Sequence, residues 1–157
     1  MYRHLKPGYG WFEFCDFDLE SFSEDGSLSP KSPLYQWQQL LLDTTDRTGK
    51  SLRYPKHTKD MLLAAGFVDI QQVTIKVPIN TWPTDPFLKD CGRWFGAGLI
   101  EGLEAMSLAP FTRVLGWTPE EVKNFLGPVT RDIQNKNIRA YNLVYVLFMH
   151  VYSQRCY

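Results

Sequence analysis

Three stretches of the chain distribute apolar side chains in the manner of β-strands. Within Trp11–Phe17 aromatic residues alternate with polar ones, the period-two pattern of a strand. Phe67–Pro78 is rich in β-branched residues and alternates cleanly over Val73–Val77, which predicts a strand with one exposed face at a sheet edge. In Arg139–Ser153 both alternating sets are apolar. This pattern is typical of a central strand covered on both sides, so we expect the last strand between the first two.

Four further stretches carry the spacing and the end signals of helices. Ser32–Pro33 and Thr118–Pro119 each place a capping hydroxyl before a proline at the first helical position. We expect Pro110 to end the third helix, and Gly127–Pro128 to kink or break the fourth, because proline removes a backbone hydrogen bond. The expected helices run from Pro33 to Gly49, from about His57 to Ala65, from about Pro86 to Leu108, and from Pro119 through Ile133.

Proline, glycine and serine mark the connections between these elements. The residues before Pro7 are expected to form the last turn of a helix, and Pro7–Gly8 a tight turn into the first strand. Glu20–Pro33 and Asn80–Pro86 are expected to be loops. The order of strands and helices predicts an α/β fold of about three strands with packed helices.

Composition narrows the class of protein. The 157 residues, 44% of them hydrophobic, are enough for a single domain over residues 1–157. The 17 basic and 17 acidic side chains cancel, so charge gives no reason to expect a nucleic acid or a membrane as partner. Cys15, Cys91 and Cys156 fit free thiols in a reducing compartment, which predicts a cytoplasmic or nuclear location.

A few polar and aromatic residues are candidates for a substrate pocket. Asp16 and Asp18 follow the expected first strand at its carboxyl end, where open α/β sheets bind ligands, although turn hydrogen bonding is the alternative. Glu104 lies in a mostly apolar helical stretch and could face an acceptor pocket. Trp82, Trp94 and Phe95 could line that pocket, with core packing as the slightly favoured alternative. We assign no catalytic residue and no metal ligand.

The third expected helix contains four glycines, at positions 92, 96, 98 and 102. Glycine lowers helix propensity, so their presence needs a reason. Close helix packing is the favoured one, and a pocket lined by bare backbone is the alternative.

Sequence blocks spread over nearly the whole chain resemble one family. They include Tyr-Arg-His-Leu-Lys-Pro-Gly at 2–8, Ala-Ala-Gly-Phe-Val-Asp at 64–69 and Trp-Pro-Thr-Asp-Pro at 82–86. The most specific block runs from Gly-Leu-Glu-Ala at 102–105 through Phe-Thr-Arg-Val-Leu-Gly-Trp-Thr-Pro-Glu-Glu-Val at 111–122. Together they resemble the C-terminal half of a class I S-adenosylmethionine-dependent methyltransferase of the fungal LaeA-like group. The resemblance implies a partial class I fold with a central antiparallel last strand, and methyl transfer to a small metabolite or protein.

Three departures from the family pattern change what the resemblance implies. Tyr9 separates Gly8 from Gly10, where the family has Pro-Gly-Gly-Trp, and Gly127–Pro128 interrupts a helix that is unbroken in relatives. The N-terminal half, which carries the glycine-rich loop and the acidic residue for the cofactor ribose, has no counterpart in the sequence. We therefore expect that this chain holds no cofactor, although the complete fold binds S-adenosylmethionine. We also expect a truncated or split protein that is inactive alone.

Two other kinds of function stay open. The chain could be a non-catalytic interaction or regulatory protein; an exposed apolar sheet edge would favour either this class or the truncated methyltransferase. It could also be a cofactor-free cyclase that uses the acceptor pocket, which a pocket without a cofactor site would favour. The expected partners are the missing N-terminal half or a second copy of the chain, together with a small-molecule metabolite.

Overall fold

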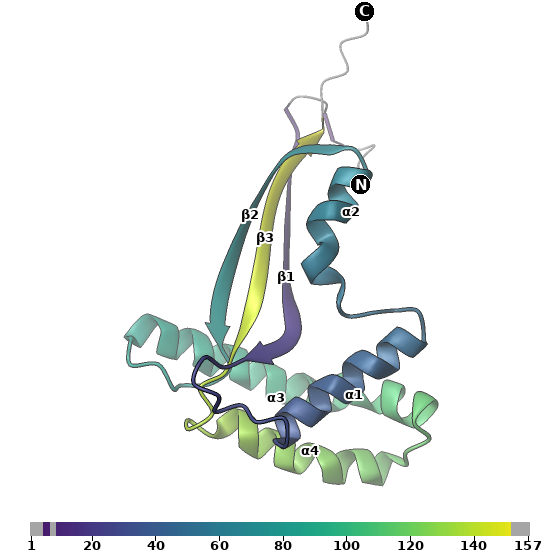
Figure 1. Ribbon diagram of the computed structural model, residues 1–157, viewed down its shortest axis with the longest axis vertical. Helices are drawn as coiled ribbons and strands as arrows, with labels where there is room; N and C mark the ends of the chain where they lie inside the picture. Colours follow the sequence, from purple (N-terminus) through teal and green to yellow (C-terminus); the bar gives the residue numbers. More distant parts are fainter. Residues whose placement is uncertain (1–4, 7–8, 152–157) are drawn as a thin grey trace, which may run out of the picture. The chain divides into compact units, whose positions relative to one another are not determined.

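The structure is a computed structural model that describes residues 5–6 and 9–151. The expected helical turn before Pro7 and the turn at Pro7–Gly8 lie almost wholly outside these residues. Just after them, the backbone N–H groups of Tyr9 and Gly10 both donate to the carbonyl of Lys6. The elements in chain order are β1 (Trp11–Phe22), α1 (Pro33–Arg47), the short 3-10 helix η2 (Tyr54–His57), α2 (Thr58–Ala64), β2 (Phe67–Pro78), α3 (Pro86–Val114), α4 (Pro119–Gln134) and β3 (Tyr141–Val151) (Figure 1).

The three strands form one sheet in the order β1-β3-β2, with β3 antiparallel to both neighbours (Figure 1). The pairing of β3 with β2 continues beyond the end of β2, where the Ile79 N–H donates to the Ala140 carbonyl at 3.1 Å. This topology confirms that the last strand is central and that Phe67–Pro78 lies at a sheet edge. It also confirms the α/β class.

The chain divides into two compact units, and each strand contributes residues to both. The first unit comprises residues 1–18, 53–75 and 144–157, and the second comprises residues 19–52 and 76–143. The first unit therefore holds η2, α2 and one end of each strand. The second holds α1, α3, α4 and the other strand ends.

Burial in the strands differs from expectation in two places. In β3, Tyr145, Leu147 and Met149 are buried, whereas Phe148 on the opposite face is 36% exposed. The prediction that β3 is covered on both faces is therefore wrong there. In β2, the apolar Val73 and Ile75 are themselves exposed. A strand is central because it is hydrogen-bonded to a strand on each side. This pairing lies in the plane of the sheet and does not require that side chains on both faces be covered.

The first strand is longer than the sequence pattern suggests, because β1 continues to Phe22. Its polar end is satisfied internally, since the Ser21 hydroxyl donates to Asn142 at 2.9 Å and its N–H donates to Gln38 at 3.2 Å. The prediction that a loop begins at Glu20 is therefore wrong. Asp16 and Asp18, expected after the strand, lie inside it.

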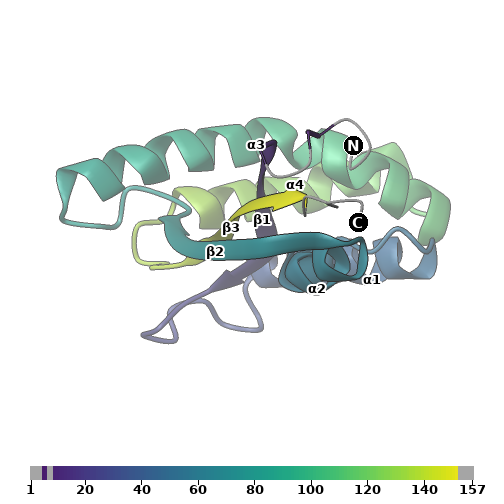
Figure 2. The ribbon, with the colours of Figure 1, turned by 90° about the horizontal axis from the view of Figure 1, so that it is seen from above.

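Helices α1, α3 and α4 pack on one another and form the core of the second unit. Figure 2 shows α3 and α4 side by side. Each helix contributes an apolar stripe, as its amphipathic pattern predicts. The fully buried side chains of the core include Leu34, Trp37, Leu41, Phe111, Val122, Val129 and Ile133.

No described helix has both the length and the apolar character needed to span a membrane.

The predicted helix starts are confirmed. The Ser32 hydroxyl accepts from the Tyr35 N–H at 3.3 Å, with Pro33 at the first helical position. At α4, the Glu121 N–H donates to the Thr118 hydroxyl at 3.2 Å, and the Thr118 N–H donates to the Glu121 carboxylate at 2.7 Å. This capping box satisfies two otherwise unpaired donors. The bond from the Thr118 N–H is also the main reason that the pKa of Glu121 is lowered.

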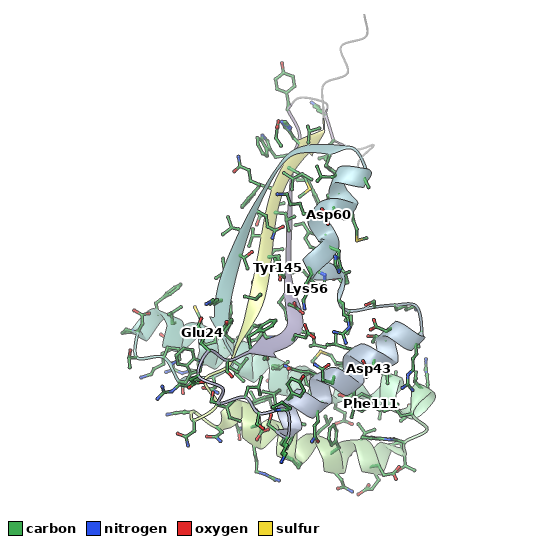
Figure 3. The ribbon with its side chains drawn as sticks, in the orientation of Figure 1. Glu24, Asp43, Lys56, Asp60, Phe111 and Tyr145 are labelled. Carbon is green, nitrogen blue, oxygen red and sulfur yellow. The ribbon has the colours of Figure 1, made fainter. Side chains whose placement is uncertain are left out.

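Neither interior proline ends its helix. Helix α3 continues past Pro110 to Val114, and α4 is continuous through Pro128. The predicted end at Pro110 is wrong, and so is a break at Pro128. Phe111 explains the first case, because its fully buried ring lies 5.3 Å from the ring of Trp117 and packs among the helices (Figure 3). In α4, Val129 and Ile133 continue the buried stripe beyond the proline.

Close packing accounts for two of the four glycines of α3. A Cβ atom at Gly92 would lie 2.0 Å from the Asn80 carbonyl oxygen, and one at Gly96 would lie 2.4 Å from that of Ile79. Gly98 has no atom within 4 Å of such a Cβ. The packing interpretation therefore holds for Gly92 and Gly96 and does not apply to Gly98.

Candidate ligand-binding site

The second unit contains a pocket of about 360 Å³ that we call the Trp82 pocket. The loop after β1, the end of β2, the segment before α3, the first turn of α3 and the start of β3 all contribute to it. Figure 3 labels one of its residues, Glu24, near the carboxyl end of β2. A volume of this size is within the range of small-molecule sites. The lining residues are Glu24, Asp25, Lys76, Pro78, Trp82, Leu88, Arg139 and Tyr141.

Trp82 is held in place by two hydrogen bonds. Its indole N–H donates to the Ala140 carbonyl at 2.9 Å, and its backbone N–H donates to Asn80 Oδ1 at 3.0 Å. The Asn80 amide is itself buried and donates to the carbonyls of Asn135 and Ile138, both at 3.2 Å. The indole is thus a preformed wall of the pocket. We did not identify Asn80 as a residue of this site from the sequence. The one feature of the sequence that points to it is its position between a strand and Trp82.

Apolar groups complete the walls. Leu88 is in the first turn of α3, where its N–H donates to the capping carboxylate of Asp85 at 2.8 Å. Its side chain is 39% exposed. The Tyr141 ring stands 6.1 Å from the ring of Phe22, which supports it. The pocket therefore offers flat and aliphatic surfaces together.

The first of two cations in the pocket is already partnered. Lys76 forms an ion pair with Glu24, and its ammonium lies 4.9 Å from the centre of the Tyr141 ring, within cation–π distance. The hydrogen bond to Glu24 is the main reason that the pKa of Lys76 is raised. This side chain stays charged at neutral pH, with its charge balanced inside the pocket.

The second cation, Arg139, is differently placed. Its backbone N–H donates to the Ser27 hydroxyl at 2.8 Å, which fixes where the side chain starts. Its Nε lies 3.8 Å from Asp25 Oδ2, which is too far for a hydrogen bond. Asp25 is stabilised mainly by Ser27, whose hydrogen bonds lower the pKa of that carboxyl. Asp25 therefore offsets the charge of Arg139 without occupying its N–H donors.

The pocket has the features of a binding site. Among the described residues that line it, none is a cysteine, serine or histidine that could serve as a nucleophile with an adjacent base. No group of three metal-ligating side chains occurs among the described residues. What the arrangement can do is hold an uncharged or singly charged small molecule between aromatic and aliphatic walls.

The predicted substrate residues of the second unit are not brought together. Trp82 lines the pocket. Phe95 is half-buried in α3 and does not line it. Glu104 is exposed, lies 3.8 Å from the Lys123 ammonium and lines a different hollow, of about 230 Å³. A substrate-binding role for Phe95 and Glu104 stays a prediction.

Asp16 and Asp18 belong to the first unit, where both make contacts within the protein. The Tyr54 hydroxyl donates to the Asp16 carboxylate, and this bond raises the pKa of Tyr54 to about 12. Asp18 is buried, and its Oδ2 lies 3.4 Å from the Lys56 ammonium, which Figure 3 shows beside β1. Both aspartates thus have structural partners. Their proposed role in substrate binding stays a prediction.

The described glycines do not form a loop of the kind that cradles S-adenosylmethionine. Gly26 is the one glycine in the connection between β1 and α1, and no atom lies within 4 Å of a Cβ built on it, so no tight cradle forms around it. The tightly packed glycines, Gly92 and Gly96, lie against carbonyl groups of this chain. Neither arrangement is the strand, glycine loop and helix that receive a dinucleotide-like cofactor.

Known proteins resemble nearly all of this chain. It is 37% identical over 142 residues to protein-methionine methyltransferase laeA of Chaetomium globosum, which covers 90% of this chain and 44% of that protein. It is 35% identical over 139 residues to methyltransferase pytC of Aspergillus terreus, covering 88% and 43% respectively. The chain is therefore a relative of fungal methyltransferases.

More narrowly, the chain is LaeA-like. It is 45% identical over 147 residues to secondary metabolism regulator LAE1 of Cochliobolus heterostrophus, covering 93% of this chain and 48% of that protein. The predicted resemblance is confirmed, and the chain spans about half the length of the relatives it matches. No family model matches the chain, and no solved structure does.

Proposed function

We propose that this chain forms the acceptor side of a LaeA-like methyltransferase, with the acceptor bound in the Trp82 pocket. The single observation that carries the proposal is the preformed aromatic pocket in a chain whose relatives are named methyltransferases. Methyl transfer depends mainly on the proximity and orientation of donor and acceptor. In this proposal Trp82, Leu88 and Tyr141 orient the acceptor and keep water from it.

The second part of the proposal is that the chain alone does not hold S-adenosylmethionine. Its support is the mismatch between the described glycines and a cofactor cradle. Titration calorimetry of the chain with S-adenosylmethionine should show no one-to-one binding at micromolar concentration. Saturable binding in that range would contradict this part.

A chimera tests whether the chain contributes to methyl transfer. The region of the Cochliobolus relative that this chain does not match would be joined to it, in place of the relative's matched region. We expect transfer of labelled methyl groups to acceptors from a fungal metabolite extract, and loss of that transfer in the Trp82→Ala variant. Circular dichroism would confirm that the variant folds. A folded chimera that binds the cofactor and transfers no methyl group would contradict the proposal.

A second candidate function is that of an interaction protein in regulation. Relatives named regulators of secondary metabolism motivate it, and so do Phe87 and Trp94 of α3, whose side chains are 75% and 74% exposed. Large exposed aromatic side chains are typical of binding surfaces. Replacing both by serine should abolish binding to a full-length relative in a pull-down while the fold persists. If the double variant binds as well as the unmodified chain, or if the unmodified chain does not bind the relative, this candidate function is excluded. A pocket without a cofactor cradle also fits cofactor-free cyclisation, but the relatives named methyltransferases give that candidate no support.

A further inference from the structure

The two cations of the Trp82 pocket differ in a way that points to its ligand. Lys76 is paired with Glu24 and lies over the Tyr141 ring. Among the described residues, the charged neighbour of Arg139 is Asp25, which lies beyond hydrogen-bond distance. No hydrogen bond from the Arg139 guanidinium is found within the described part of the chain, although its backbone is anchored to Ser27. A guanidinium offers a planar fork of donors that matches a carboxylate.

We propose that the Trp82 pocket binds a flat aromatic monocarboxylate, with the carboxylate on Arg139 and the ring system against Trp82, Leu88 and Tyr141. This inference rests on the proposed function, because it names the chemical class of the acceptor at the same site. The aromatic walls favour a planar body, since stacked and edge-on ring contacts add to the burial of apolar area.

The charges of the pocket favour a single negative charge on the ligand. Its lining carries two cations and two carboxylates, so it is neutral before a ligand binds. One carboxylate on Arg139 adds one negative charge. A dianion such as a phosphate monoester would add a second one close to Glu24 and Asp25, and like charges repel. A monocarboxylate is therefore favoured over a phosphate.

Calorimetry with 1-naphthoate as probe tests the proposal, with 1-naphthamide as its uncharged isostere. We expect the unmodified chain to bind naphthoate, and to bind naphthamide at least about tenfold more weakly, because a hydrogen bond to a charged partner is lost. The Arg139→Gln variant should lose about tenfold or more in affinity for naphthoate and be unchanged for naphthamide. The Arg139 side chain is 63% exposed, so this variant should fold.

Lys136→Gln is the matched control, because it removes one positive charge from an exposed side chain that does not line the pocket. Its affinity for naphthoate should stay within about threefold of that of the unmodified chain, since a solvent-exposed charge outside the site is largely screened. The proposal fails if naphthoate does not bind at millimolar concentration, if naphthamide binds equally well, or if Lys136→Gln weakens binding as much as Arg139→Gln. None of these measurements uses methyl transfer. Failure of the ligand class is therefore distinguishable from failure of the proposed function, which the chimera tests.

Discussion

The indole N–H of Trp37 donates a hydrogen bond to the hydroxyl of Ser107 at 2.7 Å, and both side chains are fully buried. The hydroxyl in turn donates to the Leu103 carbonyl at 2.6 Å. Trp37 belongs to α1 and Ser107 to α3, so this bond ties two helices of the second unit in one register. Buried polar groups of this kind are costly to leave unpaired.

Ser107→Ala should therefore destabilise the protein by about 1–3 kcal/mol, because the indole N–H would be left buried without an acceptor. Trp37→Phe removes the donor and some packing. If the bond carries the effect, the double variant should lose less free energy of unfolding than the sum of the two single variants. Urea unfolding measures all three. Strict additivity would show that the two side chains act independently.

Two glycines of α3 should respond to alanine in opposite ways. Gly98→Ala meets no atom within 4 Å and should stabilise the protein by up to about 1 kcal/mol, since alanine is the better helix former. Gly96→Ala would place Cβ 2.4 Å from the Ile79 carbonyl oxygen and should destabilise it. Urea denaturation of both variants tests the packing interpretation. An equal gain in stability at both positions would contradict it.

Pro128→Ala should raise the melting temperature, because α4 is continuous and an interior proline costs about 3 kcal/mol relative to alanine. Pro119→Ala is the control, since a proline at the first helical position removes no hydrogen bond and the change should be small. Differential scanning calorimetry compares the two. A lower melting temperature for Pro128→Ala would show that the proline supports a turn between two helices.

The pair of Tyr54 and Asp16 predicts a dependence of stability on alkaline pH. The pKa of Tyr54 is raised from 10.0 to about 12, mainly by its hydrogen bond to Asp16. The neutral phenol is therefore favoured in the folded state. Its contribution to stability is fully present below pH 10 and is lost as pH rises toward 12.

Ultraviolet titration tests this directly. The difference between the unmodified chain and Tyr54→Phe isolates one phenol among the 8 tyrosines. Its apparent pKa should exceed the ordinary value, and Asp16→Ala should lower it toward that value. A Tyr54 that titrates alike with and without the Asp16 carboxylate would contradict the prediction.

The first strand predicts self-association of the chain. Among the described strands, β1 pairs on one side only, and Trp11 on it is 61% exposed. Edge strands with exposed apolar side chains pair with other copies. Trp11→Lys should weaken association in sedimentation, whereas Glu13→Lys, on the same exposed face of the strand but already polar, should change it less. A stable monomer of 18.2 kDa over a wide concentration range would exclude this surface as an interface.

The sequence by itself determined the elements whose causes are local. Ser32–Pro33 and Thr118–Pro119 begin helices because a capping hydroxyl and a preset proline angle act within a few residues. Phe67–Pro78 is a strand with the predicted bounds because β-branched residues recur along its whole length. The run of apolar residues in β3 also predicted its central place. The sequence blocks in turn predicted the LaeA-like relationship.

Only the tertiary structure decided where long-range contacts outweigh local rules. Helix α3 continues past Pro110, and the burial of Phe111 offsets at least part of the cost of the hydrogen bond that the proline removes. Gly92 and Gly96 have their reason in carbonyl groups of a segment more than ten residues earlier in the chain. The pocket depends on contacts between segments as distant as Ser27 and Arg139, or Trp82 and Ala140. No local sequence pattern predicts such pairs, because the two partners are far apart in the sequence and come together only when the chain folds.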